Sequence, residues 1–130
     1  NENRVIISKS FKSYIFSKRN EYKSILLIYL KEKEFHSKLY KISSDMKSNT
    51  ENEILKISER QIFFIDKYIL KITKSNEGLA DMYQLKADIY RYLCEVSTGE
   101  HLITNKKNAT FFYNECIKNS KSLSYLNLVK

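Results

Sequence analysis

Apolar side chains recur three and four positions apart along most of this chain, which is the spacing of helices that bury one face. The first such stretch starts near Asn3 and carries the apolar positions Ile7, Phe11, Tyr14, Ile15, Tyr22, Ile25, Leu26 and Tyr29. The pattern continues from Leu39 to Ile42, and Ser, Asn and Thr residues then interrupt it up to Thr50. Because such residues compete for backbone hydrogen bonds, we expect the first helix to cover about residues 3–42.

The same spacing predicts three more helices and the start of a fifth. Thr50 is followed three positions later by Glu53, which is a capping-box pattern and indicates a helix start. A connector at residues 75–78 precedes the next helix, which we expect to end near Gly99. The predicted helices cover about residues 50–73, 79–98 and 105–121, with another beginning at 125.

The remaining pattern supports an all-α fold. No stretch alternates between apolar and polar residues as a half-buried strand does, and the chain holds no Pro and only two Gly. We therefore predict an antiparallel array of helices joined by short loops, in one domain or part of one. A tetratricopeptide-like superhelical array would also fit, although its repeat signature is absent.

The charge balance favours an acidic partner. The chain has 23 basic and 15 acidic residues, a net charge of +8. A positive field of this size attracts nucleic acid, anionic membranes and phosphorylated proteins alike, so charge alone does not separate them. Arg is scarce and Lys is the usual cation in this chain. We therefore expect each Arg to occupy a position that needs its planar group of five donors. The four are Arg4, Arg19, Arg60 and Arg91.

The cysteines and histidines give no sign of catalysis or of a metal site. Cys94 and Cys116 lie within predicted helices and lack metal-ligand or disulfide-framework spacing, which favours a reducing compartment. We expect a cytoplasmic protein, with the nucleus as the alternative. His36 and His101 have no Ser, Cys or Asp at catalytic spacing, and there is no glycine-rich phosphate loop. We therefore expect no enzyme activity and no cofactor.

The ends and the apolar runs of the chain carry no targeting signal that can be read. The longest apolar run, residues 25–30, is far shorter than the ~20 residues that span a bilayer, so we expect no membrane partner. The chain starts without Met and without a basic and apolar leader. We expect a trimmed or partial chain.

Two sets of charged residues are candidates for an anion site. Asp88 lies three residues before Arg91 and Glu95 lies four residues after it, so both carboxylates can flank the guanidinium group on one helical face. On the first helix, Lys12 and Arg19 are seven residues apart, which places them two turns and about 10 Å apart on one face. Taken alone, the first pattern is explained equally well by ordinary surface ion pairs. The second is explained better by the solvated face of a Lys-rich helix.

Two segments resemble a known family. Asn1–Lys12, reading Asn-Glu-Asn-Arg-Val-Ile-Ile-Ser-Lys-Ser-Phe-Lys, is similar to the start of the third helix of 14-3-3 proteins. Lys18-Arg19 then stands where the family has an Arg-Arg pair. Tyr90–Gly99, reading Tyr-Arg-Tyr-Leu-Cys-Glu-Val-Ser-Thr-Gly, is similar to the family's most specific motif. Lys9 and Ser10 replace small apolar residues of the family pattern, so the chain resembles a divergent member.

The resemblance implies a phosphoserine- or phosphothreonine-dependent adaptor. Carried over residue by residue, it implies that Lys12, Arg19 and Arg91 donate hydrogen bonds to the phosphate and that the Tyr92 hydroxyl donates one more. Asp88 and Glu95 would orient the basic groups. Lys23 and Lys86 match basic positions around the family's groove, and each would contact the ligand or pair internally.

The resemblance also implies that the chain is the central part of a single 14-3-3-like domain, from the third to the sixth helix and the start of the seventh. The complete protein would form a homodimer or heterodimer through helices that precede Asn1. Its partners would be phosphorylated client proteins. The chain departs from the family pattern at Gln84, where the family often has a Lys.

Two other functions remain open from the sequence. A basic helical nucleic-acid-binding domain would use the charge and the 10 Tyr and 7 Phe residues for stacking, although most of these aromatics lie on the predicted buried faces. The other alternative is a scaffold whose phosphate site is inherited but idle.

Overall fold

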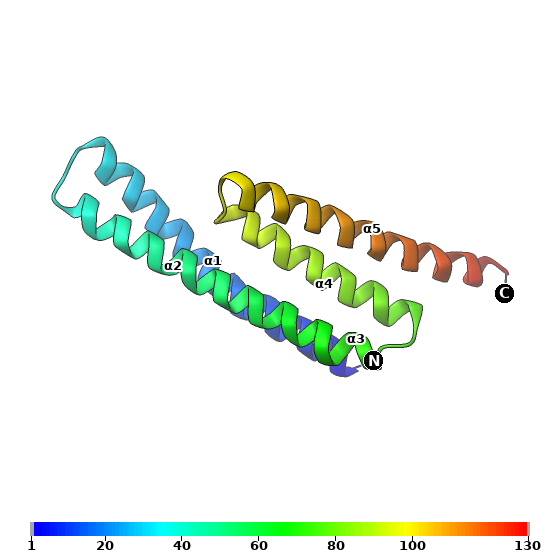
Figure 1. The fold of residues 1–130 in the computed structure, drawn as a ribbon. Coiled ribbons are helices and arrows are strands. Elements are labelled where there is room, and N and C mark those ends of the chain that lie inside the picture. Colours follow the sequence, from blue (N-terminus) through cyan, green and yellow to red (C-terminus); the bar gives the residue numbers. More distant parts are fainter. Residues whose placement is uncertain (1, 130) are drawn as a thin grey trace.

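The chain folds into two antiparallel helical hairpins that lie side by side (Figure 1). The structure is a computed structural model that describes residues 2–129, with side chains described over residues 3–121. Within this range it contains helices and no strand, so the predicted all-α antiparallel array is confirmed. The elements are α1 (Glu2–Glu34), α2 (Leu39–Phe64), the π-helical turn η1 (Ile65–Ile69), α3 (Leu70–Ile72), α4 (Asn76–Glu95) and α5 (Gly99–Val129).

The turn between the first two helices is earlier than predicted. α1 ends at Glu34 and α2 begins at Leu39, so the expected single helix over residues 3–42 is wrong. His36 makes the reversal with a left-handed φ of 48°, a conformation that His adopts more readily than most residues with a side chain. The Ser37 hydroxyl accepts a hydrogen bond from the Leu39 amide at 3.0 Å, which satisfies one of the free amides of the α2 start.

The expected helix start at Thr50 is also wrong. Thr50 is buried inside α2, and its hydroxyl donates to the Met46 carbonyl at 2.9 Å. Ser43 likewise donates its hydroxyl to the Tyr40 carbonyl at 3.0 Å. Hydroxyl groups that bond the preceding turn in this way are compatible with a continuous helix. The polar run that suggested a loop therefore lies within α2, which continues through η1 and α3 to Ile72, close to the predicted end at residue 73.

The last helix is longer than predicted at both ends. α5 begins at Gly99, where the positive φ of 60° reverses the chain. It continues as one helix to Val129, so the expected start at 105, end at 121 and new helix at 125 are all wrong. The side-chain Nδ2 of Asn105 donates to the Ser97 hydroxyl at 2.9 Å. This bond connects the first turns of α5 to the loop before it. α4 begins three residues earlier than expected because Ser75 caps it, accepting from the Gly78 amide at 3.0 Å.

The core lies where α1, the end of α2 with η1, and α4 meet. Its buried cluster consists of Ile15, Ile57, Ile65, Ile69, Met82, Leu85, Ile89 and Tyr92. The widened turn of η1 keeps both Ile65 and Ile69 in this cluster. Within the described part of the chain, no helix has the length and apolar character that crossing a membrane requires.

Candidate functional site

The candidate site lies between α1 and α4, which pack against each other in the core. Lys12 and Arg19 project from α1, and Asp88, Arg91 and Tyr92 from α4. The site therefore combines side chains from the two predicted sets of charged residues. Its geometry is organised around two carboxylates and one aromatic ring.

Asp88 joins the two helices at one end of the site. Its Oδ2 lies 3.1 Å from the Lys12 Nζ, and its Oδ1 accepts a hydrogen bond from the Tyr113 hydroxyl at 2.5 Å. The Arg91 Nη2 approaches the same Oδ1 at 3.7 Å. Only 10% of the Asp88 side chain is exposed, so its charge is shielded from solvent, and it needs these partners.

Glu95 joins the same helices at the other end. The Arg19 Nε donates to Glu95 Oε2 at 2.8 Å, and the Arg19 Nη2 donates to Oε1 at 2.5 Å. This two-point pairing fixes the plane of the guanidinium group. The hydrogen bonds from Arg19 hold the pKa of the Glu95 carboxyl below its ordinary value, and those to Glu95 raise the pKa of Arg19.

The Tyr92 ring connects the two ends. The Arg19 Cζ lies 4.1 Å from the ring centroid and the Arg91 Cζ lies 5.0 Å from it, both within the range of cation–π attraction. Tyr92 itself is buried in the core. Its ring therefore attracts both guanidinium groups.

The contacts form one connected cluster from Lys12 through Asp88, Arg91 and Tyr92 to Arg19. Of its three cations, Arg91 is held least firmly by other residues, because its side chain is 55% exposed and its ion pair with Asp88 is long. Arg19 uses two of its five N–H groups on Glu95, so three remain. The cluster can thus present several charge-assisted donors to one anion. Among the described residues, no group of three or more His, Cys, Asp or Glu side chains could hold a metal ion.

Comparisons with known proteins identify the family of this chain. A family model described as "14-3-3 protein" matches residues 1–130, the whole chain. The chain belongs to the 14-3-3 family.

Two curated 14-3-3 relatives show how far the similarity extends. The 14-3-3 protein beta/alpha of Mus musculus is 27% identical over 121 residues, which cover 93% of this chain and 49% of that protein. The Homo sapiens beta/alpha protein is 26% identical over the same shares. The chain thus spans about half the length of the curated 14-3-3 relatives it matches.

A solved 14-3-3 structure has the same fold. The crystal structure of a 14-3-3 protein from Cryptosporidium parvum superimposes with a TM-score of 0.81 at 27% sequence identity. The match covers 92% of this chain and 56% of that one. Whether this chain is the central part of a single 14-3-3 domain stays a prediction.

One expected role within the 14-3-3 motif needs correction. Asp88 and Glu95 were expected to flank Arg91 together on α4. Asp88 does contact Arg91, but Glu95 pairs with Arg19 on the neighbouring helix. A two-point pair between helices offers two short hydrogen bonds, whereas an i,i+4 pair on one exposed helix contributes only a few tenths of a kcal/mol.

The two additional lysines behave differently. Lys86 is buried and pairs internally, with its Nζ 2.6 Å from Asp66 Oδ1 and 3.9 Å from the Phe112 ring centroid. Internal pairing was one of the two roles expected for it. Lys23 is exposed, and its charge contributes to lowering the pKa of Glu95. Lys23 therefore remains a candidate groove residue.

Tyr113 on α5 belongs to the site and was not predicted. Burial, followed by its hydrogen bond to Asp88, raises the pKa of Tyr113 to about 12. The hydroxyl therefore stays protonated and keeps donating to Asp88 at neutral pH. Its place could not be read from the sequence, because it depends on the register of α5 against α4.

Proposed function

We propose that this chain binds protein segments carrying phosphoserine or phosphothreonine, as an adaptor without chemical turnover. Lys12, Arg19 and Arg91 donate hydrogen bonds to the phosphate oxygens, and the Tyr92 hydroxyl donates another. The observation that carries this proposal is that Arg19 and Arg91 flank one Tyr92 ring, at 4.1 and 5.0 Å, while Asp88 links Arg91 to Lys12.

The charge of the cluster suits a phosphate group. Three cations face two carboxylates, Asp88 and Glu95, which leaves an excess of one positive charge. A phosphorylated side chain carries between one and two negative charges and three acceptor oxygens, whereas an unmodified Ser or Thr hydroxyl has no charge. The cluster should therefore discriminate by charge.

The existing ion pairs position the donors before the ligand arrives. Glu95 and the Tyr92 ring hold Arg19 from two sides, so little side-chain entropy is lost when it binds. Arg91 is freer and can move toward the phosphate, because its ion pair with Asp88 is long, at 3.7 Å. We infer that Arg19 sets the geometry and Arg91 supplies most of the new hydrogen bonding.

The wider role belongs to the same proposal. In the complete protein, the partners are phosphorylated client proteins, and a homodimer or heterodimer forms through segments outside residues 1–130. We place this activity in the cytoplasm, in keeping with the family resemblance and the unpaired Cys94 and Cys116.

A peptide titration tests the proposal. Fluorescence anisotropy would compare a labelled phosphoserine peptide with the same peptide unphosphorylated, for the native chain and for Arg91→Ala. We expect the phosphorylated form to bind at least about tenfold more tightly, a difference of about 1.4 kcal/mol, and Arg91→Ala to abolish most of that difference. Arg60→Ala is the matched control, because Arg60 is exposed on α2 and the change in net charge is the same.

Three results would contradict the proposal. Equal binding of both peptides would remove the dependence on phosphate. Unchanged binding in the double variant Arg19→Ala/Arg91→Ala would indicate an idle site. Tighter, strongly salt-dependent binding of single-stranded nucleic acid with the same charge would support a nucleic-acid-binding domain instead.

A further inference from the structure

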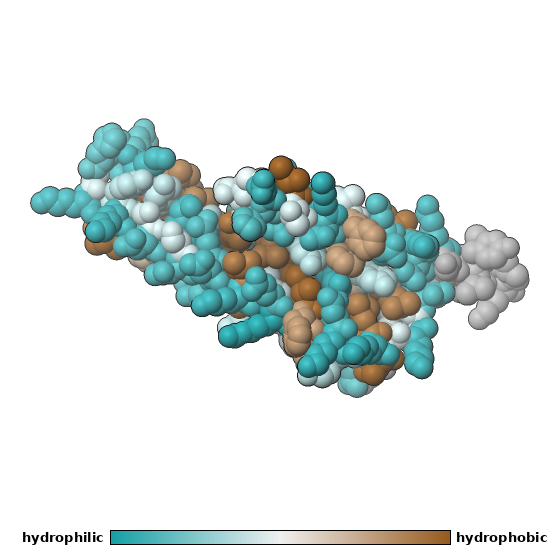
Figure 2. Space-filling model, viewed as in Figure 1, coloured by the Kyte–Doolittle hydropathy of each residue, from teal (hydrophilic) through white to brown (hydrophobic). Residues whose placement is uncertain are grey.

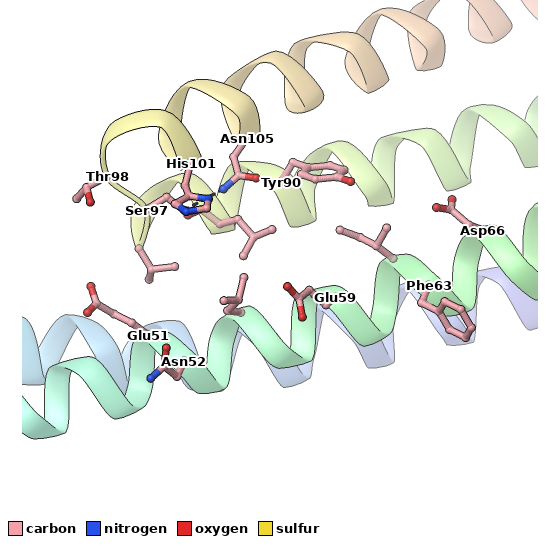
Figure 3. Close-up of a pocket in the computed structure, with 14 residues that line it drawn as sticks. Glu51, Asn52, Glu59, Phe63, Asp66, Tyr90, Ser97, Thr98, His101 and Asn105 are labelled. Atoms are coloured by element: carbon pink, nitrogen blue, oxygen red, sulfur yellow. Dashed lines mark hydrogen bonds between the residues drawn. The ribbon is translucent and has the colours of Figure 1, made fainter.

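A second concave surface lies between α2 and the α4–α5 hairpin. It is a groove of about 680 Å³. Figure 3 shows Glu59 and Asp66 from one hairpin and His101 and Asn105 from the other projecting into the space between them. Its apolar part includes Leu55 and Ile62 from α2, Leu93 from α4 and Val96, which directly follows α4. In the space-filling view, apolar surface is visible between the hairpins with hydrophilic side chains around it (Figure 2).

The charge of this groove is opposite to that of the chain. The chain has 23 basic residues among 130, yet the fourteen described residues that line the groove include no Lys and no Arg. They include three carboxylates, Glu51, Glu59 and Asp66. We call this surface the acidic groove. A strongly basic chain with one acidic concave surface concentrates its attraction for cations there.

The three carboxylates differ in how far they are already paired. Glu51 accepts from the Tyr22 hydroxyl at 3.0 Å and from the Lys47 Nζ at 3.2 Å. Asp66 pairs with the Lys86 Nζ at 2.6 Å. Glu59 is exposed, makes no ion pair with any residue that the structure describes, and points into the groove (Figure 3). Glu59 is therefore the carboxylate most available to a cationic partner.

The spacing of the carboxylates matches a helix. Glu51, Glu59 and Asp66 are eight and seven residues apart, which corresponds to about 12 and 10 Å along α2 and η1 at 1.5 Å per residue. A second helix lying along α2 can place basic residues two turns apart against them and apolar residues between. Amphipathic helices bind apolar grooves in this way, with anchors at i, i+3, i+4 and i+7.

We propose that the acidic groove binds an amphipathic helix of a partner protein that presents apolar residues flanked by Lys or Arg residues two turns apart. The apolar residues cover Leu55, Ile62 and Val96, and the central basic residue pairs with Glu59. An acidic helix or a nucleic acid would meet the unpaired carboxylate of Glu59 and no Lys or Arg among the lining residues.

The experiment uses the 130-residue chain and a defined probe. The probe is a fluorescent amphipathic peptide of about 20 residues, long enough to form helix on binding, with Leu on one face and Lys two turns apart beside it. Its counterpart carries Glu in place of each Lys. Anisotropy titrations would be made with the native chain and three variants, after circular dichroism has confirmed that each is folded.

We expect the basic peptide to bind and its acidic counterpart not to bind. Glu59→Lys should weaken binding about tenfold, because it removes an attraction and adds a repulsion. Leu55→Ser should weaken it about threefold without any change in charge, because Leu55 offers an exposed apolar contact. The matched control is Asp45→Lys, which makes the same charge change at an exposed position of α2 outside the groove and should alter binding less than about twofold.

Other results would overturn the proposal. Equal weakening by Glu59→Lys and Asp45→Lys would mean that only net charge matters, and equal binding of both peptides would mean that the groove does not read charge. Self-association of the native chain that Glu59→Lys abolishes would make a second copy the occupant instead. Phosphopeptide binding should be unchanged in Glu59→Lys, so this test and the test of the phosphate site can fail separately.

Discussion

Arg19 on α1 and Glu95 on α4 are joined by two hydrogen bonds, from Nε to Oε2 at 2.8 Å and from Nη2 to Oε1 at 2.5 Å. The residues are 76 positions apart in the chain, so this pair closes the interface between the two hairpins. The same guanidinium group covers the Tyr92 ring. One arginine therefore both connects the hairpins and orients the candidate phosphate site.

Arg19→Lys should separate these two roles. A lysine keeps the charge but can make only one of the two hydrogen bonds to Glu95 and cannot stack its plane on Tyr92. We expect a loss of about 1 kcal/mol in the free energy of unfolding, measured by urea denaturation. Arg60→Lys, at an exposed position of α2, is the control and should change stability by less than about 0.5 kcal/mol. Equal losses in both variants would mean that the pairing geometry is unimportant.

The pair with Arg19 should also make stability depend on acid. The pKa of Glu95 is held below its ordinary value of 4.5, first by the hydrogen bonds from Arg19. A carboxyl whose pKa is lower in the folded state contributes stability that is present above its unfolded pKa and is lost as the pH falls through the folded pKa. The contribution should therefore be complete at pH 7 and disappear below about pH 4.5.

Unfolding by urea at several pH values would measure this contribution. The native chain should lose more stability between pH 7 and acid pH than Glu95→Gln, which has no carboxyl to titrate at this position. Parallel pH profiles for the two chains would show that the ion pair contributes nothing to stability.

Tyr113→Phe tests the support that α5 gives to the site. The change removes the hydrogen bond to Asp88 and leaves the ring in place, so we expect a loss of about 1.5–3 kcal/mol, the range for a hydrogen bond to a charged group. Tyr14→Phe is the control, because Tyr14 is exposed. Both would be compared by chemical denaturation near neutral pH.

The titration of Tyr113 gives an independent readout. Its pKa is raised from 10.0 to about 12, first by burial and then by the bond to Asp88. Since the folded pKa is the higher one, the stability it contributes is complete below pH 10 and is lost as the pH approaches 12. Burial raises the pKa of Tyr22 to about 12 as well, so an ultraviolet titration of Tyr113→Phe should show one tyrosine fewer titrating at high pH than the native chain.

Periodicity predicted the helical architecture because α1, α2 and α4 each bury a face in one core and α5 packs against α4. It did not predict the turn at His36, because this reversal uses a left-handed residue other than Gly, without Pro or Asn to mark it. The helix start predicted at Thr50 was wrong because a capping-box pattern is read from four neighbouring residues alone. In the structure, the Thr50 hydroxyl donates to the Met46 carbonyl inside a continuous helix. The hydrophobic periodicity thus predicted the presence of the helices better than the residues at which they begin and end.

The site was predictable as far as it depends on one helix at a time. The spacing of Lys12 and Arg19, and of Asp88 and Arg91, placed each pair on one face. The partner of each carboxylate depends on how far α1 and α5 slide along α4, which no local pattern encodes. For this reason Glu95 was assigned to Arg91 instead of Arg19, and Tyr113 was missed.

Gly78→Ala should destabilise the start of α4, although Ala usually favours a helix over Gly by about 1 kcal/mol. A methyl group at this position would lie 1.6 Å from the Arg4 Nη1 and 2.6 Å from the Thr73 Cγ2. Arg4 would have to move and would lose its hydrogen bond to the Ser75 hydroxyl. Overpacking usually costs about 1–3 kcal/mol, so we expect a net loss of stability of up to about 2 kcal/mol.

A double-mutant cycle with Arg4→Ala checks this explanation. Gly78→Ala should cost clearly less in the Arg4→Ala background, because the larger clash has been removed. Gly99→Ala is the control, since its penalty comes from the positive φ of 60° and no atom lies within 4 Å of the added methyl group. Its cost should be the same with and without Arg4.

Lys86 links the core to the acidic groove, and its replacement makes the last prediction. Lys86 is buried over the Phe112 ring and its Nζ pairs with Asp66, whose side chain is 48% exposed. Lys86→Met keeps the long apolar stem and frees a carboxylate that water can solvate. Removing one partner of a buried ion pair is costly when the other charge stays buried, but Asp66 is half exposed, so we expect Lys86→Met to cost little. Lys86→Ala leaves a gap over Phe112 and should cost about 2 kcal/mol or more.

The same variants should also change binding in the groove. With Lys86 neutralised, Asp66 becomes available to a cationic helix, and one additional partly exposed ion pair of up to about 1 kcal/mol should strengthen binding about threefold. Urea denaturation and the anisotropy titration with the basic amphipathic peptide would measure the two effects on the same samples. If Lys86→Met were as unstable as Lys86→Ala, the charge of Lys86, and not its stem, would be what stabilises the packing of α4 against η1 and α5.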